Sequence, residues 1–106
     1  MERINIKDFS EYPGPRYMRL GPNSGEEFRD SILIPMIKKH GSQIVINLDG
    51  VMGYGSSFLE ESFGGLIRAG IPHDLVNELV QRLVSDDDPS RIYEIKDYVQ
   101  EEISRV

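Results

Sequence analysis

The sequence predicts a single α/β domain in which a small mixed sheet of about four strands packs against a layer of helices. Two patterns predict this class. Short segments of alternating or β-branched apolar residues are typical of strands, and longer segments between them repeat apolar residues at helical spacing. The length of 106 residues suits one compact core, so residues 1–106 are expected to form one domain.

The N-terminal segment is expected to form a β-hairpin. Residues 3–7 alternate apolar and polar side chains, as a strand does. The Tyr-Pro-Gly-Pro sequence at 12–15 predicts a loop, because two prolines and a glycine interrupt regular pairing. Residues 16–20 are then predicted to be a second short strand that pairs with the first.

A helix is predicted from Ser24 to about residue 40. Ser24 and Glu27 have the spacing of a capping box, in which both side chains accept hydrogen bonds from free amides at the helix start. Pro35 has no N–H to donate to the preceding turn, so a kink is expected near Ile34. Basic residues in the last turn and the glycine after it fit the end of a helix.

The clearest strand is predicted at residues 43–48. This nearly continuous run of branched aliphatic residues indicates burial on both faces and a central place in the sheet. Ile44, Ile46 and Leu48 are therefore expected to be buried. A glycine-rich loop is predicted to follow at 49–55.

A second long helix is predicted from Ser56 to Gly70, again from the spacing of its apolar residues. Gly64 and Gly65 lie inside it, and each glycine costs roughly 1 kcal/mol relative to alanine. This cost indicates that another backbone approaches closely there, from the sheet or from a partner.

The C-terminal part is expected to hold two further helices and a last strand. Pro72 fits the first turn of a short helix that runs to about Val80. Residues 81–85 are predicted to form a strand, with a longer helix through Leu83 as the alternative. An aspartate-rich turn at 86–90 precedes the final helix, whose apolar stripe consists of Ile92, Ile95, Val99 and Ile103.

Composition and charge restrict the classes of function. Residues 41–106 hold twelve Asp/Glu against five Lys/Arg, and this acidic part would repel phosphate backbones, so nucleic-acid binding is not expected. The sequence has no cysteine, no apolar run near the roughly 20 residues of a membrane helix, and no apolar signal core at its start. A cytoplasmic protein without membrane contact is expected.

The sequence carries no strong catalytic or metal-binding pattern. His40 and His73 have no second ligand at metal-site spacing, so no metal and no cofactor are expected. The loop from Gly53 to Ser57 lacks the Lys-Ser/Thr of a nucleotide-binding P-loop. We therefore expect no enzyme, with a small enzyme or nucleotide-binding domain built on this loop as the alternative. Arg16 and Arg19 are expected to be solvated.

One stretch of the sequence has a recognisable pattern. Ile44-Val45-Ile46-Asn47-Leu48-Asp49-Gly50-Val51 is a strand that ends in an acidic residue, and after a loop Ser56-Ser57-Phe58-Leu59 opens a helix. This pattern resembles the core of STAS domains, the anti-sigma factor antagonists and the cytoplasmic ends of sulfate transporters. Over about 3–102 the chain is similar to a closer group, the STAS-like domains of unknown function. The resemblance implies a STAS-like fold.

Ser56 matches the serine that partner kinases phosphorylate in STAS antagonists, so the resemblance implies a phosphosite. Two positions depart from the pattern: Gly55 stands where antagonists carry aspartate, and Phe58 stands where they carry glycine. The residues also allow a purely structural interpretation. Ser57-Phe58-Leu59-Glu60 is itself a capping box, and both serines then serve only the helix start.

Asp49 has two interpretations as well. A turn-forming aspartate would accept hydrogen bonds from amides of its own loop, whereas a recognition carboxylate would lie on the same edge as Ser56. The candidate phosphosite or partner-contact residues are Ser56, Ser57, Asp49, Phe58 and Glu60.

These observations predict a non-catalytic protein-binding and signalling module. The resemblance implies that it docks a regulatory protein, such as a histidine-kinase-like ATPase, through the surface from Asp49 to Phe63 and is switched by phosphorylation. A homodimer built through Gly64, Gly65 and exposed apolar residues is a third hypothesis.

Overall fold

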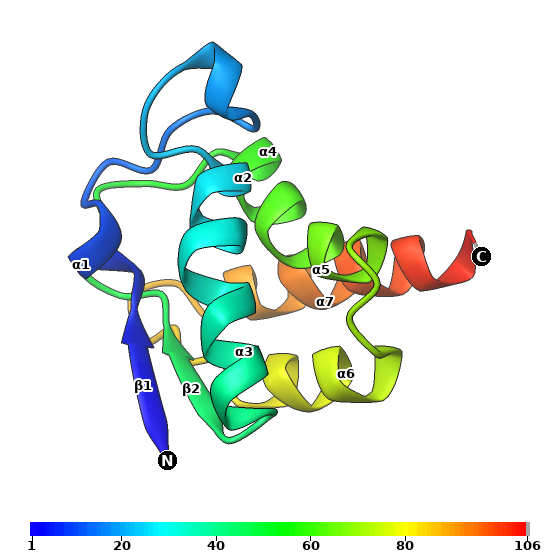
Figure 1. The fold of residues 1–106 in the computed structure, drawn as a ribbon. Coiled ribbons are helices and arrows are strands. Elements are labelled where there is room, and N and C mark those ends of the chain that lie inside the picture. The colour runs from blue at the N-terminus through cyan, green and yellow to red at the C-terminus, as the bar shows by residue number, and fades with distance from the viewer. Residues whose placement is uncertain (106) are drawn as a thin grey trace.

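The computed structural model describes residues 1–105 and shows a small parallel sheet covered by helices (Figure 1). Its strands are β1 (Glu2–Asn5) and β2 (Ile44–Asn47). Its helical elements are α1 (Ile6–Phe9), the 3₁₀ turn η1 (Met18–Leu20), α2 (Gly25–Phe28), the π turn η2 (Arg29–Leu33), α3 (Ile34–His40), α4 (Ser56–Leu59), the π turn η3 (Glu60–Gly64), α5 (Gly65–Arg68), α6 (His73–Gln81) and α7 (Ser90–Ser104). No helix within residues 1–105 is long and apolar enough to cross a bilayer.

The sheet is parallel and small. β1 pairs with β2 in a register that places Ile4 beside Ile46. On the other side of β2, Val84 makes a single bridge to Asn47, with its amide donating to the Ile46 carbonyl at 2.9 Å. β2 is therefore central, as predicted, and the side chains of Ile44, Ile46 and Leu48 are buried.

The prediction of about four strands in a mixed sheet is wrong, because two predicted strands do not form. Residues 16–20 fold back onto the start of α2 instead of pairing with β1. The Gly25 amide donates to the Pro15 carbonyl at 2.9 Å, and the Glu26 amide donates to the Arg16 carbonyl at 3.0 Å. These bonds use backbone groups that a hairpin would need.

The first and the last predicted strands differ from expectation as well. β1 ends at Asn5, because Ile6 turns into α1 and is buried there. In the segment 81–85, α6 extends to Gln81 and only Val84 pairs with the sheet. The helix alternative for this segment therefore holds for its first residue only.

The helix predicted from Ser24 to residue 40 is confirmed, and η2 lies in its middle. The Ser24 hydroxyl accepts from the Glu27 amide at 3.0 Å, while the Glu27 carboxylate accepts from the amide of Asn23, one residue before the cap. The kink expected near Ile34 falls at this π turn, which ends at Leu33, two residues before Pro35. Its wider turn relieves the crowding that proline causes in an α-helix.

The helix predicted from Ser56 runs through α4, η3 and α5, and it contacts the start of α2 at Gly25. A Cβ on Gly25 would lie 2.6 Å from the carbonyl oxygen of Phe58 and 3.2 Å from its Cα. The backbone approach that was predicted at Gly64 and Gly65 is therefore found at Gly25. At Gly64 and Gly65 a Cβ would meet the charged ends of this chain's own Glu60 and Arg29, so no partner backbone is needed to explain these glycines.

The last two helices complete the core. α6 buries Val76, Leu79 and Val80. The predicted stripe of α7 is confirmed: Ile95 and Val99 are buried, and Ile92 and Ile103 are partly buried against the same core.

Candidate functional site

The loop that follows β2 is held by Asp49. Its two carboxylate oxygens accept from the amides of Asp86 and Asp87, at 3.0 and 2.9 Å. In return the Gly50 amide donates to the Asp87 carboxylate at 3.1 Å. Asp49 thus joins the end of the strand to the turn before α7. The prediction that it bonds amides of its own loop is wrong, and its carboxylate is occupied by two structural hydrogen bonds.

Ser56 is exposed at the start of α4 and does not cap the helix. The capping position is Gly55, which has no side chain to accept from the helix amides. The predicted capping box beginning at Ser57 is therefore wrong, since Ser57 already lies in the first helical turn. The Ser56 side chain has no capping role to perform.

The Ser56 hydroxyl lies near a hydrogen-bonded pair on α7. In this pair the Tyr98 hydroxyl donates to the Glu94 carboxylate at 2.5 Å. Burial and the bond to Glu94 raise the pKa of Tyr98 to about 12, although the nearby Ser56 hydroxyl opposes the change. Tyr98 therefore keeps its proton at neutral pH.

Phe58 is fully buried, so the expectation that its side chain meets a partner does not hold. Its ring stacks on Phe28, with ring centroids 5.9 Å apart, and lies 6.0 Å from the ring of Tyr54. The phenylalanine fills the core between α2 and α4.

Glu60 belongs to a cluster of ion pairs that sequence reasoning missed. It pairs with Arg16 and accepts a two-pronged interaction from Arg68, at 2.9 Å for each nitrogen. Burial alone would raise the pKa of Glu60, but the hydrogen bonds from Arg68 and Arg16 outweigh it and hold the pKa below its ordinary value. The same bond to Glu60 raises the pKa of Arg68.

Glu61 forms the buried centre of this cluster and is 5% exposed. It pairs with Arg29, and also with Arg16 and Arg68 at 3.1 Å each. Arg68 continues the cluster to Glu102 of α7, at 3.3 Å. Arg16, expected to be solvated, is thus a half-buried bridge between the loop before α2 and the helix from Ser56. Only the spacing of Glu60 and Glu61 from Arg68 on one helix could have signalled the cluster.

A polar cavity of about 440 Å³ lies over these ion pairs and reaches Tyr98. Its walls are Arg16, Tyr17, Glu60, Glu61, Arg68, Tyr98, Glu101, Glu102 and Arg105. Its arginines are paired with glutamates, including Arg105 with Glu102 at 2.6 Å. The cavity is therefore lined by side chains of both charges, and its lining does not select a ligand of one sign of charge.

The glycine loop shows no cradle for a ligand. A Cβ on Gly53 or Gly55 would meet nothing within 4 Å, so neither glycine is needed to admit a close neighbour. The three cavities described for this structure are lined by other residues. Within residues 1–105, no cluster of three His, Asp or Glu side chains is arranged to hold a metal ion.

The fold and the site together define a small α/β domain. In it a buried parallel strand is followed by a loop that Asp49 holds in place, and this loop leads to the exposed start of a helix. The family model of the STAS-like domain of unknown function (DUF4325) matches residues 24–88, more than half of the chain. The chain therefore belongs to this STAS-like family. Comparison with curated proteins and with solved structures gives no match.

Proposed function

We propose that this chain is a non-catalytic module that binds a regulatory protein through the exposed surface around Ser56. The observation that carries the proposal is that Ser56 is exposed and does not cap its helix. It stands at a helix start, it is exposed, and Gly55 occupies the capping position. A hydroxyl that the fold does not use for capping is available to a partner or to a modifying enzyme.

A phosphate on Ser56 would meet less repulsion than the two glutamates that follow on the same helix suggest. It would add about −1.5 to −2 charge at the positive end of a helix. Glu60 and Glu61 follow on the same helix, but Arg16, Arg29 and Arg68 already neutralise them. The repulsion that these two glutamates would otherwise exert is therefore reduced.

The partner surface would combine this serine with the loop that Asp49 holds in place. Met52 on that loop is 69% exposed, and its amide donates to the Glu11 carbonyl at 2.8 Å. A fixed, exposed methionine is suited to an apolar contact with a protein. The resemblance to anti-sigma factor antagonists supports a histidine-kinase-like ATPase as the partner.

Site-specific photo-crosslinking in cells tests the docking surface. A crosslinking amino acid at Met52 or Ser57 is expected to capture the same regulatory protein. The matched control is Tyr93, which is equally exposed but lies on α7. Equal capture at Tyr93, or no capture at Met52 and Ser57, would contradict the proposed surface.

The captured partner then allows a test of the switch. Ser56→Ala is expected to keep its affinity for the partner, whereas Ser56→Asp is expected to weaken it by roughly 1–3 kcal/mol, the usual size of such couplings. Titration calorimetry with both variants measures this difference. Equal affinities for the two variants would rule out a charge switch at Ser56.

A further inference from the structure

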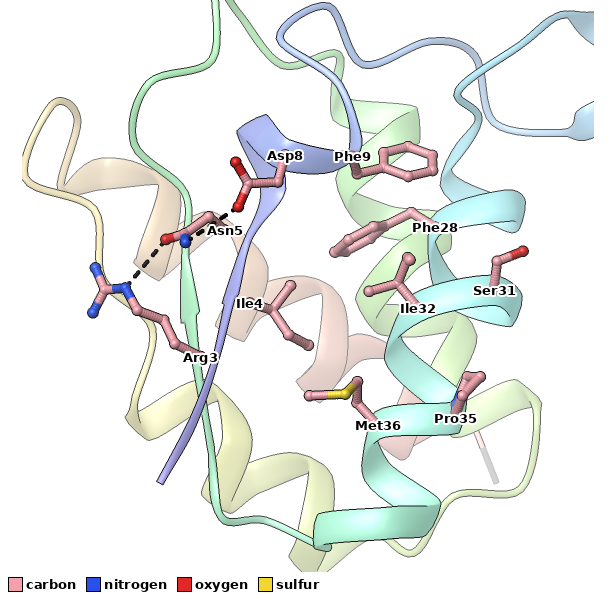
Figure 2. Close-up of a pocket in the computed structure, with 10 residues that line it drawn as sticks. All are labelled: Arg3, Ile4, Asn5, Asp8, Phe9, Phe28, Ser31, Ile32, Pro35 and Met36. Carbon is pink, nitrogen blue, oxygen red and sulfur yellow. Dashed lines mark hydrogen bonds between the residues drawn. The ribbon is translucent and has the colours of Figure 1, made fainter.

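An apolar groove of about 390 Å³ lies between β1 and the helix formed by α2, η2 and α3 (Figure 2). Ile4 reaches into it from the strand, facing Ile32 and Met36 of the helix. Phe9 and Phe28 close one end. The complete lining is Arg3, Ile4, Asn5, Asp8, Phe9, Phe28, Ser31, Ile32, Pro35 and Met36.

One wall of this groove is the unpaired edge of β1. The Glu2 amide donates to the Gln43 carbonyl at 3.1 Å, and the register pairs Glu2 with Ile44 and Ile4 with Ile46. In a parallel ladder alternate residues direct both backbone groups to the same neighbour. Glu2 and Ile4 therefore bond β2. Both backbone groups of Arg3 and the amide of Asn5 point away from it, while the Asn5 carbonyl accepts the first hydrogen bond of α1. Such an edge is a template for another strand.

We propose that a second copy of this chain occupies the groove, with the two β1 strands paired antiparallel about a two-fold axis. An axis at Ile4 places Arg3 of each copy opposite Asn5 of the other. The Asn5 amide of each copy then donates to the Arg3 carbonyl of the other, which gives two hydrogen bonds across the axis. The result is one continuous four-stranded sheet.

The helices fit the same arrangement. Neighbouring strands lie about 4.8 Å apart, so the strand pairs of the two copies are offset by about 10 Å. Packed helices lie about 8–10 Å apart. The two α2–α3 helices would therefore pack side by side over the joined sheet. This contact would cover the partly exposed side chains of Ile32 and Met36.

Charge complementarity favours a second copy over a different partner. The helix begins with the acidic Glu26, Glu27 and Asp30 and ends with the basic Lys38 and Lys39. A two-fold axis sets the two helices antiparallel. The acidic start of each helix then lies beside the basic end of the other, and the helix dipoles are opposed. This surface is complementary to itself.

Sedimentation equilibrium of the purified chain tests the proposal, with a concentration-dependent dimer as the expected result. Arg3→Pro places a proline ring on the outward edge of β1, where it crowds the incoming strand, and removes none of the bonds to β2. It is expected to weaken the dimer about tenfold or more. Circular dichroism checks that this variant is folded. Asp97→Lys changes an exposed side chain of α7, away from the groove. It is the control and is expected to dimerise as the wild type does. A chain that is monomeric at all concentrations overturns the proposal.

A charge exchange separates this interface from any other. Lys38→Glu/Lys39→Glu places acidic residues at both ends of the helix, and Asp30→Lys weakens the acidic start; all three side chains are exposed. Lys38→Glu/Lys39→Glu is expected to dimerise poorly, because both ends of its helix are then acidic, and Asp30→Lys is expected to weaken the dimer less, because Glu26 and Glu27 remain at the helix start. A dimer unaffected by Arg3→Pro and by both charge variants lies on another face, and it would overturn the proposal equally.

Discussion

The two long helices, 24–40 and 56–68, are built alike but start differently. Each has a four-residue α segment followed by a five-residue π turn and a second α segment. The first starts with Ser24, which is buried and accepts from the Glu27 amide. The second starts with Gly55 as its cap and leaves Ser56 exposed. A serine at a helix start is therefore a buried cap in one helix and an exposed residue without a capping role in the other.

The largest effect is expected at the contact between the helices, in Glu61→Ala. This change removes a buried carboxylate and leaves Arg29 only its pair with the exposed Asp30, and breaking a buried ion pair typically costs about 3–5 kcal/mol. Urea unfolding measures the loss. Glu60→Ala is the comparison, and it should cost less, because the Glu60 side chain is more exposed. Equal losses would show that burial does not decide the role of each glutamate.

The next largest effect is expected from Gly25→Ala. The new methyl group would collide with the backbone of Phe58, and overpacking of this kind costs about 1–3 kcal/mol. Gly55→Ala is the matched change at the other helix start, where nothing lies within 4 Å and φ is −78°. It should change the free energy of unfolding by less than about 0.5 kcal/mol. A tolerated Gly25→Ala would disprove the close contact of the two helices.

The third prediction compares the serines directly. Ser24→Ala removes a cap and is expected to cost about 1–2 kcal/mol. Ser56→Ala is expected to cost less than about 0.5 kcal/mol, because no helix amide depends on it. Thermal unfolding of the two variants gives the comparison. A cost for Ser56→Ala as large as that for Ser24→Ala would return Ser56 to a structural role.

The smallest effect is expected from pH. The pKa of Glu60 is held below its ordinary value in the folded protein, against the effect of burial, by Arg68 and Arg16. A carboxylate of this kind stabilises the fold above its unfolded pKa and loses that contribution as pH falls through the folded pKa. The Tm difference between the wild type and Glu60→Gln should therefore be largest near neutral pH and should approach zero at acid pH. A difference that is constant with pH would argue against these ion pairs.

Local signals in the sequence predicted much of the fold. The cap at Ser24, the apolar stripe of α7 and the buried run around Ile46 each depend on residues close together in the chain, and all three are confirmed. The segment 16–20 has the composition of a strand, but its backbone groups bond the start of α2. Propensity does not reveal which of two distant partners a segment will choose.

The candidate site was predicted in position but not in chemistry. The sequence places Asp49 at the end of the strand and Ser56 at a helix start, and the structure agrees. The sequence does not reveal that the amides bonded by Asp49 belong to residues 86 and 87, or that the Phe58 side chain is buried. The ion pairs of Glu61 join positions 16, 29 and 68, and such a set is visible only after the chain has folded.

The parallel sheet has a consequence for the order in which the chain acquires its structure. β1 pairs with a strand some forty positions later, and the bridge from Asn47 to Val84 spans a similar stretch. Within residues 1–105 every strand pairing joins distant parts of the chain, and closing such long loops costs entropy before any bond is gained. We expect the two long helices to meet first, through Gly25 and Phe58. During synthesis, β1 would leave the ribosome first and would find its place in the sheet only after β2 had emerged.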